Sequence, residues 1–297
     1  MNQRCFKMQL ATDIERLDID GAAATLQGVA VTTPLMTNIN WSNRLNCKIY
    51  FKREDLQVVR SYKIRGAFNK ISSLSSLQKE AGVVCASAGN HAQGVAYSCS
   101  LMNINGVIFM PTTTPNQKLE QVKMFGGKAI EILLQGDTFD DAADAALKYC
   151  RSRGRTFIHP FNDQKVIEGQ GTVGKEIIAQ AQEPLDYIFL PVGGGGLAAG
   201  VASYVKTYSP KTKIIGVEPE GASSLTEALK FGSPVKLNKV DKFIDGASVK
   251  KIGELNFNYC QELLDDVITV PEGAVCTTIL ELYNKDAIVV EPAGALA

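Results

Sequence analysis

The sequence has no surplus of charge of either sign. Its 297 residues contain 31 Lys+Arg and 31 Asp+Glu, which leaves a formal net charge of zero. Binding to a phosphate backbone requires a cationic surplus on at least one face of a protein. Only 1 Trp is present, and no basic run has aromatic residues interleaved with it. We therefore expect no nucleic-acid partner.

Metal-ligating patterns and long apolar runs are scarce as well. The only histidines are His91 and His159, and the 7 cysteines are scattered without the paired spacing of a zinc site. Each cysteine is expected to be a small, buried side chain in a reducing compartment. No apolar stretch reaches the ~18 residues of a membrane span, and no signal core follows the N-terminus. We expect no metal, no membrane and a cytoplasmic location.

Short apolar runs alternate with segments of helical length from about residue 47 onward. Six of these runs are predicted to be strands: Cys47–Phe51, Gly82–Ala86, Gly106–Met110, Ala129–Leu134, Asp186–Val192 and Lys213–Val217. A helix is predicted over Thr138–Cys150. This alternation predicts the α/β fold class, with parallel sheets that carry helices on both faces.

Domain boundaries are weakly marked in this sequence. The length favours roughly two domains, but no Gly/Ser linker separates them. The most polar, turn-like stretch near the middle is Arg151–Arg155, which is a candidate crossing point between domains. The last residues, Glu291–Ala297, resemble the start of a helix that stops at once, because Pro suits a first helical position. The chain is therefore expected to be truncated at its C-terminus.

A glycine cluster follows the predicted strand that ends at Val192. The cluster precedes a helix of small residues and consists of Gly193, Gly194, Gly195, Gly196 and Leu197. Backbone N–H groups that converge at a helix N-terminus form a cradle suited to a phosphate. The pattern lacks the spacing of a dinucleotide fingerprint and the Lys-Ser/Thr ending of a nucleotide P-loop. A phosphate-binding loop is favoured, and a simple tight turn is the alternative.

A second turn follows the predicted strand Gly82–Ala86 and opens a helix. It consists of Ser87, Ala88, Gly89, Asn90 and His91. Backbone N–H groups and short polar side chains in such a turn suit a carboxylate. Helix capping by Ser87 or Asn90 explains the same residues equally well. A lone histidine such as His91 is more often structural than catalytic.

Lys63 lies just ahead of a predicted helix, in the segment Ser61–Ala67. A lysine beside an aromatic residue, here Tyr62, can form a Schiff base with a carbonyl cofactor. Most lysines of a chain are solvated surface groups, and on these residues alone that interpretation is favoured for Lys63 over a catalytic role.

In their order and separation, these segments closely resemble threonine dehydratase (threonine ammonia-lyase) of the biosynthetic type. That family uses pyridoxal phosphate and has the tryptophan-synthase-β-like fold, fold type II, with two open, mostly parallel sheets. The resemblance runs from about Thr33 to the last residue and rests on Lys52–Asp55, Ser61–Ala67, Ser87–Gly94, His159–Phe161, Gly169–Thr172, Gly193–Leu197 and Glu291–Ala295. It implies a large cofactor-binding domain of residues 1–70 and 154–297, lacking its C-terminal part, and a small inserted domain of residues 71–153. A regulatory ACT-like domain is not expected in this chain.

The resemblance also implies a role for each motif. Lys63 would be the catalytic Schiff-base lysine, Tyr62 would pack beside the pyridine ring, and Asn90 would hydrogen-bond the phenolic oxygen of the cofactor. The glycine cluster would bind the phosphate, and the turn from Ser87 to His91 would bind the substrate carboxylate. The implied reaction converts L-threonine to 2-oxobutanoate and ammonia, the first step of isoleucine biosynthesis, with L-serine as a weaker substrate. The full-length enzyme would be a homo-oligomer, a dimer or a tetramer.

Other positions narrow the choice within this family. Ala88 stands where racemising relatives have a serine, and Arg53–Asp55 and Pro292 fit the biosynthetic branch better than the degradative one. Ser224 stands where some relatives have an acidic metal ligand, so no metal is expected. The alternatives left open are a serine dehydratase, racemase or β-replacement enzyme of the same fold, and a truncated, inactive fragment. A nucleotide-binding Rossmann protein is disfavoured because no acidic partner follows the glycines.

Overall fold

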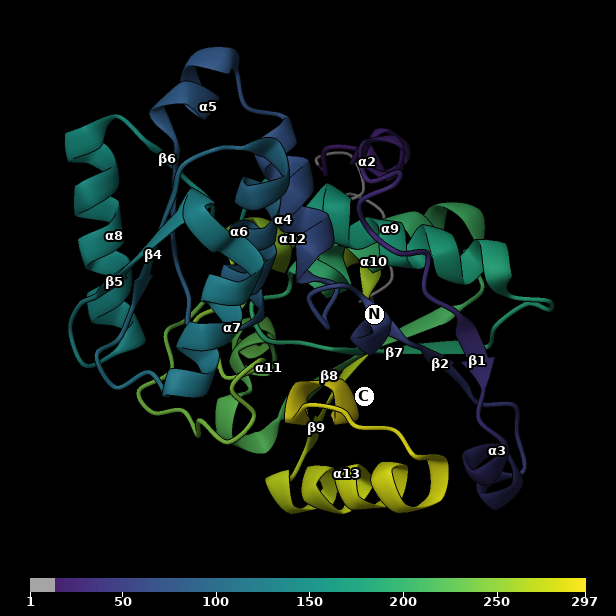
Figure 1. Cartoon of the computed structure of the whole chain (residues 1–297). Helices are drawn as coiled ribbons and strands as arrows, with labels where there is room; N and C mark the ends of the chain where they lie inside the picture. The colour runs from purple at the N-terminus through teal and green to yellow at the C-terminus, as the bar shows by residue number, and fades with distance from the viewer. Residues whose placement is uncertain (1–13) are drawn as a thin grey trace. The chain divides into compact units, whose positions relative to one another are not determined.

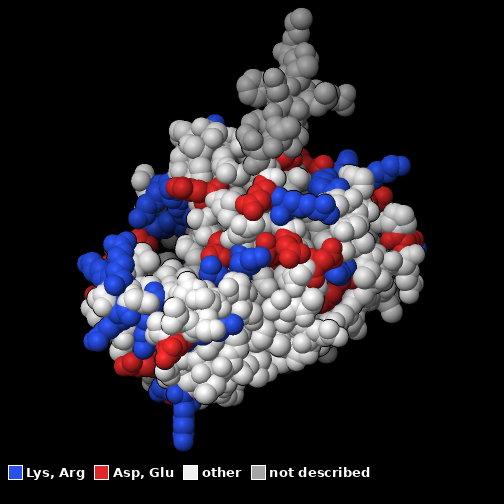
Figure 2. All heavy atoms as spheres, turned by 90° about the horizontal axis from the view of Figure 1, so that it is seen from above, with Lys and Arg blue, Asp and Glu red and all other residues white. Residues whose placement is uncertain are grey.

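The structure is a computed structural model, and it describes residues 14–297. The chain forms two compact units (Figure 1). Unit 1 contains the described residues up to Ile19, together with Thr32–Arg53 and Gly171–Ala297. Unit 2 contains Asp20–Val31 and Glu54–Gln170. Lysine and arginine side chains lie interspersed with acidic ones over the face drawn in Figure 2, in keeping with the balanced composition.

Unit 2 is built around a four-stranded parallel sheet. Its order is β5 (Ile130–Leu134), β4 (Gly106–Met110), β3 (Val83–Ala86) and β6 (Thr156–Phe157). Every residue of the central strands β3 and β4 is buried, which is why both appear in the sequence as unbroken apolar runs. Because the strands of this sheet run parallel, their carboxyl ends lie at one edge of it, where ligands bind in folds of this kind.

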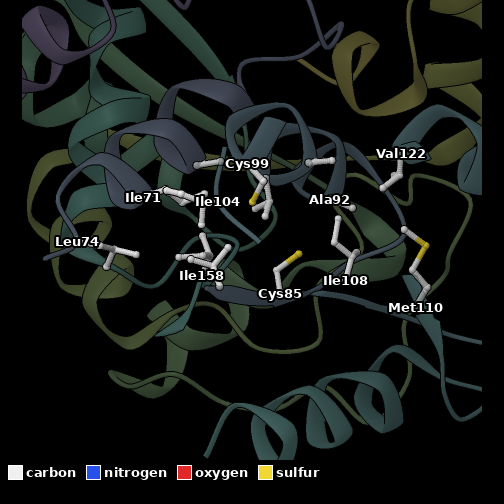
Figure 3. Packing of buried hydrophobic residues seen from close by; sticks show 14 residues of the cluster. Ile71, Leu74, Cys85, Ala92, Cys99, Ile104, Ile108, Met110, Val122 and Ile158 are labelled. Atoms are coloured by element: carbon white, nitrogen blue, oxygen red, sulfur yellow. The ribbon is translucent and has the colours of Figure 1, made fainter. Parts of the chain in front are cut away.

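Helices cover both faces of this sheet. One face packs against α4 (Lys63–Ser72), α6 (Asn90–Met102) and α7 (Asn116–Gly126), and the other against α8 (Phe139–Arg153). Alternate strand residues separate the two clusters, because Cys85 belongs to the first and Val84 to the second. Figure 3 shows Cys85 and Cys99 among the aliphatic side chains of the first cluster.

Three short elements complete unit 2, and two helices contain residues of both units. They are η1 (Glu54–Leu56), α5 (Ser76–Ala81) and η2 (Gly127–Ala129), with α2 (Ile19–Thr25) and α9 (Gln164–Gln180) running across the division between the units. Helix α8 begins with a capping box in which Thr138 and Asp141 satisfy each other's backbone N–H groups. It ends at Gly154, which has a φ of 61°. The polar stretch Arg151–Arg155 is therefore a helix end inside unit 2.

Unit 1 contains a three-stranded parallel sheet and a separate antiparallel pair. The sheet has the order β7 (Tyr187–Pro191), β8 (Lys213–Pro219) and β9 (Asp266–Val270), and the pair joins β1 (Leu35–Thr37) to β2 (Tyr50–Lys52). The helices are α3 (Ile39–Leu45), α10 (Gly196–Tyr208), α11 (Ser224–Phe231), α12 (Glu254–Leu263) and α13 (Glu272–Asp286), with η3 (Glu220–Ala222) and η4 (Pro292–Ala295). Val217 of β8 packs on α13 and η4, whereas Gly216 faces Leu264 at the end of α12. Helices thus flank this sheet on both faces.

The predicted α/β class is confirmed, and among the strands of residues 14–297 those that the sequence did not predict are β1, β6 and β9. The expected domains, 1–70 with 154–297 and 71–153, stay a prediction. The compact units divide the chain at different residues, since 54–70 and 154–170 group with the middle segment. No helix in the described part of the chain is long and apolar enough to cross a membrane.

The expectation that every cysteine is buried is wrong for two of them. Cys47 and Cys276 are exposed, because Cys47 follows the left-handed residue that ends α3 and Cys276 lies on the open side of α13. Four others are buried and reduced: Cys85, Cys99, Cys150 and Cys260. Cys5 lies outside the described residues.

Candidate active site

Lys63 is the first residue of α4 and is only partly exposed. Its Nζ donates a hydrogen bond to the carbonyl oxygen of Pro160 at 3.2 Å. The same nitrogen lies 5.3 Å from the centroid of the Tyr62 ring, so the predicted neighbour of the lysine is in place. Lys63 is therefore held by its own unit and is not a freely solvated surface lysine.

Close backbone packing surrounds this start of α4. A Cβ at Gly94 of α6 would lie 3.1 Å from the carbonyl carbon and oxygen of Lys63. A Cβ at Gly169 of α9 would lie 2.5 Å from the carbonyl oxygen of Arg65. Glycine at these two positions lets α6 and α9 approach α4 at the residues that carry the lysine.

Replacing Gly169 with alanine should test this packing. Alanine favours a helix by about 1 kcal/mol over glycine, but an added methyl against backbone costs about 1–3 kcal/mol or more. We expect a net loss of about 1–2 kcal/mol in the free energy of unfolding, measured by urea denaturation. Gly273→Ala in α13 is the matched control, because its Cβ would meet no atom within 4 Å. If both variants were equally stable, the close approach would not constrain α4.

A buried ion pair lies two residues beyond Lys63. The Arg65 side chain is 1% exposed, and its Nε and Nη2 each donate to the Glu54 carboxylate at 2.8 Å. Nη2 also donates to the carbonyl oxygen of Val31 at 3.2 Å, and the Gln57 amide binds the same carbonyl at 2.7 Å. The sequence placed Arg65 and Glu54 in motifs, but it did not show that they pair. Together they anchor α4 to the segments before it.

The turn from Ser87 to His91 lies at the carboxyl end of β3, as predicted. The Ser87 N–H donates to the carbonyl oxygen of Phe109 at 3.1 Å, and its Oγ accepts from the Gly89 N–H at 3.2 Å. Helix α6 then begins at Asn90, with Gly89 as its N-cap and no side-chain cap. Neither Ser87 nor Asn90 therefore caps this helix, which disfavours the capping alternative. Its N-terminal end is suited to an anionic group.

His91 is 3% exposed and joins this turn to the end of β6. Its Nε2 lies 2.9 Å from the carbonyl oxygen of Ile158. A carbonyl oxygen can only accept, so Nε2 carries the proton, and the buried Nδ1 makes no hydrogen bond with described residues. Burial, together with the charge of Lys63, lowers the pKa of His91 to about 3. His91 is therefore neutral at physiological pH.

His159 is the second neutral imidazole near Lys63. Its Nδ1 accepts from the N–H groups of Phe161 at 3.2 Å and Asn162 at 2.8 Å, which assigns the proton to Nε2. Burial lowers the pKa of His159 to about 4, with the charge of Lys63 acting in the same direction. Two carbonyl oxygens of the segment Ile158–Pro160 thus accept hydrogen bonds, that of Ile158 from His91 and that of Pro160 from Lys63.

These two histidines predict acid-sensitive folding. Their pKa values are lower in the folded chain than the ordinary 6.5, so the unfolded chain takes up protons first as the pH falls. The stabilisation is fully present above pH ~6.5 and is lost below it, by about 1–2 kcal/mol per histidine between pH 7 and pH 5. Urea denaturation of the wild type and of His91→Gln at both pH values should show a smaller loss in the variant. Equal losses would contradict the buried, neutral state of His91.

The glycine cluster belongs to unit 1 and lies at the carboxyl end of β7, as predicted. Gly195 has a φ of 86°, which is the left-handed region, and α10 begins at Gly196. A Cβ at Gly193 would lie 2.9 Å from the Cα of Ala247. Leu197 is buried in the first turn of α10. The cluster is therefore a strand-to-helix loop whose backbone needs glycine.

Glu218, at the end of β8, is fully buried, and its carboxylate is already used within unit 1. It accepts hydrogen bonds from the N–H groups of Leu225 and Thr226 at 2.7 and 2.8 Å and from the Thr226 hydroxyl at 2.8 Å. Burial raises the pKa of Glu218. No group of three His, Cys, Asp or Glu residues in the described part of the chain is placed to hold a metal ion.

Comparison with known proteins identifies the family. Residues 26–297 match the model of a family described as "Pyridoxal-phosphate dependent enzyme". The chain belongs to the pyridoxal-phosphate-dependent enzyme family. The pyridoxal phosphate expected from the sequence is thereby confirmed as the cofactor of the family.

The relatives bear out the type of enzyme as well. The chain is 57% identical over 279 residues to the biosynthetic L-threonine dehydratase IlvA of Halalkalibacterium halodurans, covering 94% of this chain and 67% of that protein. It is 55% identical over 276 residues to the protein of the same name from Bacillus subtilis, covering 93% of this chain and 65% of that protein. The chain thus spans about two thirds of the length of these two relatives. The resemblance to biosynthetic threonine dehydratases is confirmed.

A solved structure supports the fold. The processed form of threonine deaminase isoform 2 from Solanum lycopersicum has a TM-score of 0.88 and 43% identity, covering 99% of this chain and 82% of that chain. Structures of serine racemases are similar too, and that from maize has a TM-score of 0.90 and 33% identity. Fold type II is therefore confirmed.

The residues present fit pyridoxal phosphate. Lys63 supplies a held primary amine beside an aromatic ring, which suits an aldehyde on a planar heterocycle. The cluster Gly193–Leu197 supplies a strand-to-helix loop with a left-handed glycine, which suits a phosphate.

Proposed function

We propose that this chain carries the catalytic part of a biosynthetic threonine dehydratase. With pyridoxal phosphate it converts L-threonine to 2-oxobutanoate and ammonia, and it converts L-serine more slowly. The observation that carries the proposal is Lys63, a half-buried amine held on the Pro160 carbonyl beside two neutral histidines. The high identity to relatives of that name supports threonine as the substrate.

Pyridoxal phosphate, when bound, supplies a conjugated ring that withdraws electrons from the substrate Cα. In our proposal Lys63 holds the cofactor aldehyde between turnovers. Once the amine of the substrate has displaced it, the Lys63 amine would be free to act as the general base toward the substrate Cα proton. Because His91 and His159 stay neutral, neither adds a positive charge beside this amine near neutral pH.

The remaining predicted residues orient substrate and cofactor in this proposal. The turn from Ser87 to His91 opens α6 without a side-chain cap, so its N–H groups suit the substrate carboxylate. Asn90 in the same turn binds the phenolic oxygen of the cofactor, and Tyr62 packs beside its ring. The cluster Gly193–Leu197 binds the phosphate. A cytoplasmic location and a dimer or tetramer of the full-length protein complete the proposal.

A catalytically inactive fragment is the second candidate, and β7 is the observation that favours it. This strand lies at the edge of its sheet, and the side chains of Tyr187 and Phe189 are 50% and 51% exposed. Their rings stack on each other at 6.1 Å on that open strand. Exposed aromatic residues on a sheet edge are a liability for folding and solubility.

One assay separates these possibilities. Purified chain with pyridoxal phosphate is incubated with L-threonine, with L-serine or with neither, and keto acid and amino-acid chirality are both measured. We expect 2-oxobutanoate from L-threonine at a higher kcat/KM than pyruvate from L-serine. If racemised amino acid formed without keto acid, the chain would be a racemase and the proposed dehydratase activity would be wrong. No product of either kind would favour the inactive fragment.

A further inference from the structure

The carbonyl oxygen of Gly194 is held by α12. It accepts a hydrogen bond from Nδ2 of Asn256 at 2.6 Å and a longer one from the Gly253 N–H at 3.3 Å. Asn256 lies in the first turn of α12, and its side chain is fully buried. No motif in the sequence points to this residue, because it stands 62 positions from the glycine that it binds.

This contact sets the direction of the next backbone N–H. The Gly194 carbonyl and the Gly195 N–H belong to one peptide unit, and the two point in opposite directions across a trans peptide. With the carbonyl turned toward α12, the Gly195 N–H is turned away from that helix. The left-handed φ of 86° at Gly195 then leads directly into α10. Successive N–H groups in such a turn form an anion-binding concavity.

The packing around Gly195 leaves little freedom for another arrangement. A Cβ at Gly195 would lie 3.0 Å from the Cβ of Asn256 and 3.0 Å from a side-chain carbon of Ile252. The Gly195 carbonyl in turn accepts from the Ala199 N–H of α10 at 2.9 Å. The loop is therefore fixed between α12 on one side and the start of α10 on the other.

We propose that Asn256 is a positioning residue that sets the glycine loop for the cofactor phosphate. It acts through Gly194: its amide holds the carbonyl, and the peptide then presents the Gly195 N–H to the phosphate. This inference rests on the proposed function, in which the loop binds that phosphate. An aspartate at this position would face the carbonyl with acceptors only, and a leucine would offer it no donor.

Two ligands that differ only in the phosphate give the test. The affinities of pyridoxal phosphate and of pyridoxal are measured by absorbance titration for the wild type, Asn256→Leu and Asn256→Asp. We expect each variant to bind pyridoxal phosphate about ten- to hundredfold more weakly, as for one lost charge-assisted hydrogen bond. Pyridoxal binding should change less than about twofold. Asn258→Ala, on the exposed side of α12, should leave both affinities unchanged.

The outcomes separate this inference from the proposed function. If the wild type bound pyridoxal phosphate no more tightly than pyridoxal, the chain would have no phosphate site, and the proposed function would be wrong. A phosphate preference that survives in Asn256→Leu and Asn256→Asp would overturn the role of Asn256 and leave the function intact. Equal weakening of both ligands would also overturn it, because a merely structural residue has that effect.

Backbone NMR of the wild type gives a second measurement that depends on no variant. In a ¹⁵N-labelled chain we expect the Gly195 amide resonance to shift on addition of pyridoxal phosphate and not on addition of pyridoxal. A Gly195 resonance that does not respond to pyridoxal phosphate would contradict the proposal even if every variant failed to fold.

Discussion

Replacing Lys63 with alanine is expected to lower the rate of 2-oxobutanoate formation from L-threonine by at least about a thousandfold. The substitution removes both the amine that holds the cofactor aldehyde and the base beside the substrate Cα. The fold should be retained, because the Lys63 side chain is only partly buried and stands at the first residue of α4. A steady-state assay with saturating pyridoxal phosphate measures the loss.

Lys128→Ala is the matched control for this variant. Lys128 is exposed and lies in η2 of the same unit. Its replacement should leave kcat and KM unchanged. If Lys63→Ala kept more than a tenth of the wild-type rate, the catalytic role of Lys63 would be lost, whatever the control showed.

Removing the negative charge of Glu54 is expected to lower the free energy of unfolding by about 3–5 kcal/mol. Glu54→Gln removes the carboxylate charge that faces the buried Arg65 guanidinium, and breaking a buried ion pair on one side is costly. Urea denaturation at pH 7 measures the change. Glu54→Gln combined with Arg65→Met should recover a large part of the loss, since a buried pair can be replaced by apolar groups at little cost.

An exposed ion pair of the same unit provides the comparison. Glu120 and Lys123 lie at 2.9 Å with side chains 70% and 58% exposed. Glu120→Gln should change stability by less than about 1 kcal/mol. A loss of similar size in Glu54→Gln would mean that the Arg65 network does not anchor the start of α4.

The parts of the fold that could be predicted are those with a local signal. Strands β3 and β4 are short apolar runs behind a glycine, and both appear nearly where the sequence placed them. Strand β6 has two residues and β9 carries exposed positions along its length, so neither has a clear pattern. The compact units group Glu54–Gln170 together, and no linker in the sequence marks the ends of that segment.

In the candidate site, too, features with a local sequence signal could be predicted and long-range contacts could not. The motifs around Ser87 and Gly193 were visible because each couples a strand end to a helix start, and Lys63 was visible as a lysine beside an aromatic residue just ahead of a helix. The residues that hold these motifs were not, because they act over long separations. The bond from Lys63 to Pro160 joins residues 97 positions apart, and that from His91 to Ile158 joins residues 67 apart. Only the folded chain brings such pairs together.

The most direct test of the account is the site at which the cofactor attaches. Purified chain is incubated with pyridoxal phosphate, reduced with borohydride, digested and analysed by peptide mass spectrometry. We expect the cofactor mass on the peptide that contains Lys63, and we expect none on the corresponding peptide of Lys63→Ala. Label on other lysines with Lys63 unmodified, or no label at all, would contradict it.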